Sequence, residues 1–169
     1  MTDLEPVRAV QLHLLRHAHA GDPFEWDGPD EARPLSPRGE RQADRLGRFL
    51  AGVGFRTDAI ITSPKVRAVQ TAEIVAERLG VPVGTDDRLA GDVGLGALEA
   101  ILLDAGHPTS PILVGHDPDF SAVVSRLSGA KGIRLPTCTL ARVDLDARPA
   151  AGGGSLRWLI PPDALAGSV

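Results

Sequence analysis

Four residues in this chain have the side chains needed to handle a phosphoryl group, and each follows a short apolar run. Arg16 and His17 end the first such run, Arg67 lies one helical turn beyond the second, and His116 follows a later one. Arginine guanidiniums bind phosphate oxygens through paired hydrogen bonds. A neutral imidazole can attack phosphorus when its other nitrogen donates a hydrogen bond that fixes the tautomer. His17 is therefore the predicted nucleophile.

The other three residues would carry the positive charge that phosphoryl transfer needs. We expect His116 to donate to the phosphoryl oxygens and, with Arg16 and Arg67, to stabilise the negative charge on the equatorial oxygens. Because side chains supply this charge, the sequence predicts a site without metal and without cofactor.

Short apolar runs alternate with amphipathic stretches along most of the chain. Strands are predicted at residues 9–15, 59–62, 81–85, 111–114, 139–145 and 156–160. This alternation indicates an α/β fold, a three-layer helix/sheet/helix sandwich with a mostly parallel mixed sheet of about six strands. Ligands of such sheets bind beyond the carboxyl ends of the strands, so we expect the four residues to meet at one edge.

Helix starts are predicted where a capping side chain precedes proline or an apolar periodic stretch. Ser36 with Pro37 is predicted to begin one helix, and Ser63 with Pro64 repeats that signal before the helix that carries Arg67. Asp92 is the predicted cap of a helix that ends near Gly106.

A long segment, residues 18–35, separates the first strand from the first helix and shows no sustained periodicity. Loops of this length in compact domains are usually functional or disordered. Phe24 and Trp26 would either line a substrate mouth or pack the loop onto the body, and we favour packing.

Length and composition indicate one soluble domain over residues 1–169. The chain has 43% hydrophobic and 24% charged residues, a net charge of -4 and a pI near 5.7, which disfavours broad nucleic-acid binding. Cys138 is the sole cysteine, as in proteins of reducing compartments, and is predicted to be a core residue. Met1 to Arg8 lack signal-peptide features, and no apolar stretch is long enough to span a membrane. A cytoplasmic location is expected.

Three motifs of the chain resemble those of the histidine phosphatase superfamily, which has a phosphoglycerate mutase-like fold. They are Leu14-Leu15-Arg16-His17-Ala18, then Ser63-Pro64 with Arg67-Ala68 and Gln70-Thr71-Ala72, then Val114-Gly115-His116. The resemblance implies that His17 becomes phosphorylated while Arg16, Arg67 and His116 bind the phosphoryl group. The short length and the form of the first motif resemble the small SixA-type phosphohistidine phosphatases more than the mutases.

The chain departs from the mutase-like pattern at the proton donor. Those members carry a glutamate after the third strand, and residues 87–91 offer no clear equivalent. His116-Asp117 resembles the His-Asp arrangement of the acid phosphatase branch, so Asp117 is a possible proton donor. Asp22 and Asp119 are the next candidates. Capping of the following helix is an equal alternative for Asp117.

A missing acid favours a substrate whose leaving group needs little protonation. Imidazole, with a free pKa of about 6.5, leaves more easily than an alkoxide. We therefore expect a phosphatase with a phosphohistidine enzyme intermediate that acts on phosphohistidine or phosphoprotein substrates. The alternatives are a phosphatase of small phosphate monoesters, such as sugar or nucleotide phosphates, and a non-catalytic module that binds phosphorylated partners. Specificity is expected to reside in residues 18–35 and 86–96.

Overall fold

The computed structural model describes residues 9–166, so Met1–Arg8 and the last residues of the predicted 1–169 domain lie outside it. Six strands form one sheet in the order β3-β2-β4-β1-β5-β6. Their bounds are β1 Val10–Arg16, β2 Ala59–Thr62, β3 Val83–Thr85, β4 Pro111–Gly115, β5 Leu140–Leu145 and β6 Gly154–Ile160. Each strand lies within about two residues of its predicted position.

The pairing of the strands aligns the carboxyl ends of β1, β2 and β4. β3, β2, β4 and β1 run parallel, β5 pairs antiparallel with β1, and β6 pairs antiparallel with β5. In register, Arg16 stands opposite Gly115, and Thr62 stands opposite Val114. The chain therefore leaves β1, β2 and β4 at the same edge, as predicted from the apolar runs.

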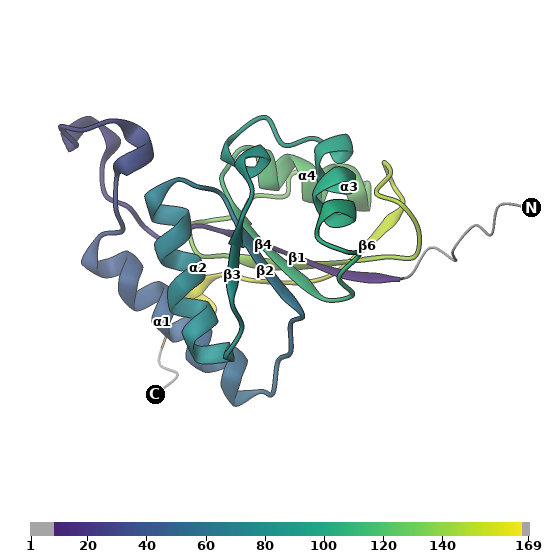
Figure 1. The fold of residues 1–169 in the computed structure, drawn as a ribbon, viewed down its shortest axis with the longest axis horizontal. Helices are drawn as coiled ribbons and strands as arrows, with labels where there is room; N and C mark the ends of the chain where they lie inside the picture. Colours follow the sequence, from purple (N-terminus) through teal and green to yellow (C-terminus); the bar gives the residue numbers. More distant parts are fainter. Residues whose placement is uncertain (1–8, 167–169) are drawn as a thin grey trace, which may run out of the picture.

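Helices cover both faces of this sheet (Figure 1). α1 (Pro37–Gly52) and α2 (Val66–Leu79) lie on one face, and α3 (Leu95–Asp104) and α4 (Asp119–Ser128) lie on the other. Each layer has its own apolar core, because neighbouring residues of a strand point to opposite faces. The mostly parallel mixed sheet and the three-layer sandwich are confirmed.

Local signals located one helix start correctly and two incorrectly. Ser36 caps α1 by accepting from the Gly39 N–H, as predicted. α2 begins at Val66 with Lys65 as its N-cap, not at Ser63, and the Ser63 hydroxyl is hydrogen-bonded to His116 across the sheet edge. The prediction for Asp92 is also wrong: α3 begins at Leu95, and Asp92 adopts a positive φ of 57° in the turn before it.

The segment between β1 and α1 projects from the body at the end of the molecule where α1 and α2 begin (Figure 1). It contains two short 3-10 turns, η1 (Pro23–Glu25) and η2 (Asp30–Ala32). Phe24 is 97% exposed, so the expectation that it packs the loop onto the body is wrong. Trp26 is 38% exposed, and its indole N–H donates to the carbonyl of Pro29 within the same segment. Within residues 21–34 no side chain is buried, and the buried Leu35 anchors the end of the segment in the core.

Smaller elements complete the described chain. They are η3 (Asp87–Ala90) after β3 and η4 (Pro162–Leu165) after β6. Cys138 is buried, as predicted, and its burial raises the pKa of the thiol to about 12. No helix between residues 9 and 166 has the length and apolar character to cross a membrane.

Candidate active site

The carboxyl edge of the sheet brings the predicted site residues together. The His17 N–H donates to the carbonyl of Gly115 at 3.0 Å, and the Ser63 N–H donates to that of Val114 at 2.9 Å. The three chain segments therefore remain joined just beyond the strand ends. The rings of His17 and His116 lie 5.2 Å apart between centroids, which is close enough for both to contact one phosphoryl group.

His17 is arranged as a neutral imidazole with one free nitrogen. Its Nδ1 lies 2.7 Å from the carbonyl oxygen of Ala18, which can only accept, so Nδ1 carries the hydrogen. The pKa of His17 is lowered to about 4, chiefly by burial; the Ala18 hydrogen bond raises it, and the charges of Arg67 and Arg16 lower it. At neutral pH the Nε2 lone pair is therefore available for attack on an electrophile.

His116 is arranged as a donor. Its Nε2 lies 2.7 Å from Ser63 Oγ, and that hydroxyl oxygen already accepts from the Lys65 N–H at 3.3 Å. Among the described residues, His116 Nε2 is the one partner that could accept the Ser63 hydroxyl hydrogen, so we assign the hydroxyl as the donor and place the imidazole hydrogen on Nδ1. That atom is buried and has no partner among the described residues. Burial and the neighbouring His17 lower the pKa of His116 to about 3, so the free Nδ1–H is a neutral donor.

Arg67 lies in the first turn of α2 and is only 5% exposed. Its terminal nitrogens bind the loop residue Asp30, with 2.7 Å to the carbonyl oxygen and 2.9 Å to carboxylate Oδ2. Burial raises the pKa of Asp30, but the hydrogen bonds and charges of Arg67 and Arg33 more than offset this and hold it below its ordinary value. Arg67 thus meets an anionic oxygen in the folded chain, while its buried Nε has no partner within residues 9–166.

Arg16 is the last residue of β1, and its guanidinium contacts Leu135 and Asp117. Its Nη1 donates to the carbonyl of Leu135 at 2.7 Å and lies 3.7 Å from Oδ2 of Asp117. Both oxygens of Asp117 accept from Ser121, at 3.1 Å from its N–H and 2.6 Å from its hydroxyl. Asp117 therefore stabilises the first turn of α4 and stands beside a guanidinium, while proton donation by Asp117 stays a prediction.

The other two aspartates considered as donors have backbone partners. Asp22 accepts from the N–H of Phe24 at the start of η1, and Asp119 lies 3.3 Å from the N–H of Val93. Neither contact reaches the histidine pair.

The backbone that follows His17 is fixed by residues whose role the sequence reasoning missed. The Ala18 N–H donates to Thr71 Oγ1 at 3.0 Å, and the His19 N–H donates to Gln42 Oε1 at 2.9 Å. Gly39 approaches so closely that a Cβ there would lie 2.0 Å from the carbonyl oxygen of His19. Thr71 belongs to a motif noted above, but Gln42 and Gly39 look like ordinary helix residues in a single sequence.

Asp30 was also missed, because nothing in the pattern of the loop distinguishes it from Asp22 or Asp27. His19 is half-buried, and its Nδ1 lies 2.7 Å from Ser36 Oγ, the cap of α1.

Comparison with known proteins agrees with this geometry. The model of the histidine phosphatase superfamily (branch 1) matches residues 12–110. The chain is 27% identical over 158 residues to the phosphohistidine phosphatase SixA of Escherichia coli strain K12, covering 90% of this chain and 94% of that protein. It is 32% identical over 113 residues to the 8-oxo-(d)GTP phosphatase of Mycolicibacterium smegmatis, covering 64% of this chain and 34% of that protein.

The fold gives the same answer. A solved structure of the protein histidine phosphatase SixA complexed with tungstate superposes with a TM-score of 0.79 and 25% identity, covering 92% of this chain and 99% of the other. Family motifs, shared edge and fold thus coincide, and the chain belongs to the histidine phosphatase superfamily as a SixA-type member.

Proposed function

We propose that this protein is a metal-independent phosphatase that forms a phosphohistidine at His17 and acts on phosphohistidine or phosphoprotein substrates. The observation that carries the proposal is the hydrogen bond from His17 Nδ1 to Ala18, which leaves Nε2 as the free nitrogen in a buried, neutral imidazole. The protein would bind phosphorylated protein partners through one domain, since a single six-stranded sheet runs through residues 10–160.

In the first step, the Nε2 lone pair of His17 attacks phosphorus. The bond from phosphorus to the leaving nitrogen or oxygen breaks, and its electron pair leaves with that atom, which takes a proton from solvent or an acid. In the second step, water attacks the phosphorus, the bond to Nε2 breaks, and the electron pair returns to His17 while the proton of the water goes to solvent. Phosphate is released.

Three groups are proposed to bind the phosphoryl oxygens in both steps. They are the guanidiniums of Arg16 and Arg67 and the unpartnered Nδ1–H of His116. Since the terminal nitrogens of Arg67 already hold Asp30, the phosphoryl group would use the remaining N–H groups of Arg67 or replace the carboxylate. Arg16 and His116 already lie at the sheet edge before the substrate arrives, and donors placed in advance stabilise a developing charge best.

Leaving-group chemistry supports a phosphohistidine substrate. The carboxylates near the site act as hydrogen-bond acceptors in this structure, as Asp117 does toward Ser121. An imidazole leaving group tolerates this, because its pKa of about 6.5 lets solvent protonate it. The Escherichia coli relative is named a phosphohistidine phosphatase, which points the same way.

A phosphatase of small phosphate monoesters is an equally supported alternative, since the Mycolicibacterium smegmatis relative is named for a nucleotide substrate. Measuring kcat/KM for a phosphohistidine peptide against sugar and nucleotide phosphates decides between them. A clear preference for a sugar or nucleotide phosphate would overturn the first choice.

The covalent intermediate is tested by trapping. The protein is mixed with a labelled phosphodonor and quenched with base, and we expect alkali-stable, acid-labile phosphate on His17. His17→Asn should lose the label and turnover. His107→Asn is the matched control, because His107 is exposed and its positive φ of 56° suits asparagine. Absence of label and of turnover across the phosphate panel would instead support a non-catalytic binding module.

A further inference from the structure

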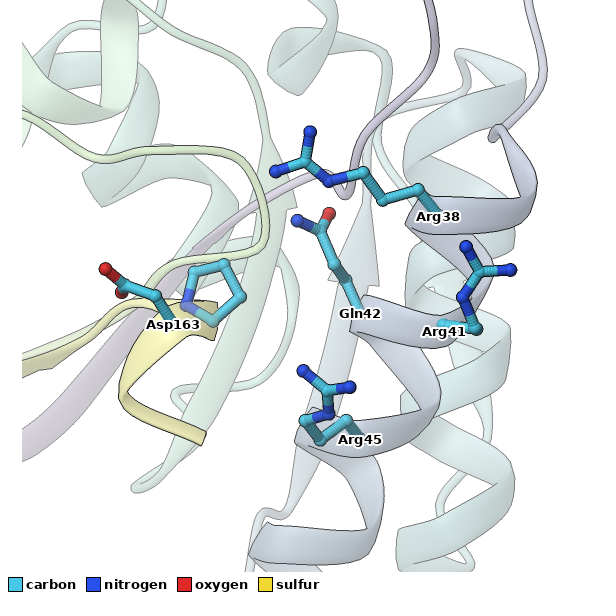
Figure 2. A pocket seen from close by; sticks show the side chains of 6 residues that line it. Arg38, Arg41, Gln42, Arg45 and Asp163 are labelled. Carbon is cyan, nitrogen blue, oxygen red and sulfur yellow. The ribbon is translucent and has the colours of Figure 1, made fainter. Parts of the chain in front are cut away.

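Arginines of α1 surround a hollow between this helix and η4 (Figure 2). The hollow has a volume of about 180 Å³ and is lined by Arg38, Arg41, Gln42, Arg45, Pro162 and Asp163. We call Arg38, Arg41 and Arg45 the arginine face. Arg38 and Arg41 are exposed, and Arg45 is half-buried.

The arginine face holds positive charge that the rest of the described chain does not neutralise. None of its three arginines forms an ion pair within residues 9–166. Arg48, one turn further along the same helix, differs because it pairs with Asp44 at 2.8 Å. Among the described residues, Asp163 is the one carboxylate side chain that lines the hollow. A chain with a net charge of -4 thus presents a locally cationic surface.

This surface adjoins the segment that carries the candidate nucleophile. Gln42 lines the hollow, and its Oε1 accepts from the N–H of His19, two residues after His17. On the other side, β6 ends at Ile160 opposite Leu140, which itself pairs with Leu15 near the end of β1. The hollow therefore lies at the same edge of the sheet as the active site.

The spread of the guanidiniums fits a protein surface better than a single phosphate. Arg38 and Arg45 are seven residues apart, which corresponds to about 10 Å along a helix. Figure 2 shows their guanidiniums on either side of the Gln42 amide, while that of Arg41 points away from Asp163. Cations arranged in this way can each meet a different carboxylate of an extended acidic segment.

We propose that the arginine face docks an acidic segment of the phosphoprotein substrate and so presents the phosphorylated side chain to His17. The proposal rests on the proposed function and assigns the substrate as a protein with acidic residues near its phosphorylation site.

The test uses two short peptides with one central phosphohistidine, flanked by glutamates in the first and by glutamines in the second. At low salt we expect kcat/KM to be about tenfold higher for the glutamate peptide. Raised salt should remove that preference, because screening weakens exposed charge pairs. p-Nitrophenyl phosphate, which has no flanking residues, reports on the chemistry alone.

The variant Arg38→Glu/Arg45→Glu should lose the preference while its kcat/KM for p-nitrophenyl phosphate stays within about twofold of the starting protein. Glutamate in the first turn of α1 is compatible with the helix dipole. Arg126→Glu/Lys131→Glu is the control, because it changes the net charge equally at exposed positions on the α4 side of the sheet. This control should keep the preference.

Binding measured without catalysis separates the two proposals. A labelled, unphosphorylated glutamate peptide should bind the starting protein and the control, and should bind the arginine-face variant about tenfold more weakly. Equal binding of the glutamate and glutamine peptides, or of a single-stranded oligonucleotide as tightly as the glutamate peptide, overturns the docking proposal. Peptide binding without turnover of any substrate supports docking and overturns the phosphatase function.

Discussion

Hydrogen bonds to neighbouring atoms decide what each histidine of the site can do. His17 and His116 are chemically identical side chains, yet Ala18 gives the first a free lone pair and Ser63 gives the second a free N–H. Burial keeps both neutral by lowering their pKa values to about 4 and about 3. One residue can thus attack phosphorus while the other donates to its oxygens.

A substitution at Asp117 distinguishes a positioning role from proton donation. We expect Asp117→Asn to reduce kcat/KM by about tenfold for phosphohistidine peptide and phenyl phosphate alike. The reason is that its carboxylate holds Ser121 and stands beside Arg16, so its loss disturbs phosphoryl binding for any leaving group.

Steady-state kinetics on both substrates checks this expectation. A loss that is much larger for phenyl phosphate, whose leaving group is more basic, would contradict it and establish Asp117 as a proton donor. Asp119→Asn serves as the control, since the Asp119 carboxylate contacts the backbone of Val93.

At the scale of elements, the start of α1 positions the backbone after β1. Ser36 caps the helix, Gln42 binds the His19 N–H, and Gly39 touches the carbonyl of His19. The active-site segment is therefore supported by a helix that contributes no residue to the predicted chemistry.

Gly39→Ala tests this support. A Cβ at Gly39 would lie 2.0 Å from a backbone oxygen, so the helix or the 17–19 segment must move. We expect a loss of about 2 kcal/mol in the free energy of unfolding, together with reduced activity.

Gly52→Ala at the end of the same helix is the matched control. A Cβ at this position meets no atom within 4 Å, so the change should be neutral or stabilise the protein by up to about 1 kcal/mol. Denaturant unfolding measures both variants, and similar stability for the two would show that the contact at Gly39 is unimportant.

For the whole molecule, buried histidines make the stability depend on pH. Burial is the main reason that His13 and His17 have pKa values of about 4 and His116 of about 3, whereas unfolded histidine titrates near 6.5. Between pH 6.5 and about 4 the unfolded chain binds protons that the folded chain does not, so the free energy of unfolding must fall as pH falls.

Each histidine should contribute up to about 1.4 kcal/mol per pH unit in that window. Asp30, Asp58 and Asp86 have pKa values below the ordinary 3.8, so their contribution is lost only at lower pH. Urea unfolding across this range measures the slope, and His17→Asn should reduce it by about one-third because one of three groups is removed. A free energy that stays flat from pH 6.5 to 4 would contradict the prediction.

The strands, the layers and the edge at which the site lies were predictable from the sequence. Apolar strands and amphipathic helices are local patterns, and parallel connections leave few ways to assemble them. Arg16, His17, Arg67 and His116 stand out for the same reason, because each ends or follows a strand or begins a helix next to one.

Contacts between residues that are distant in the sequence could not be predicted. Ser63 looks like a helix cap but binds His116, 53 residues away, and Asp30 binds Arg67, 37 residues away. The exposure of Phe24 and the cationic hollow beside Gln42 likewise follow from where whole segments lie. By itself the sequence determined which residues could carry the chemistry. Only the tertiary structure decided their tautomers, their neutral state and their neighbours, because these depend on burial and on hydrogen bonds that folding creates.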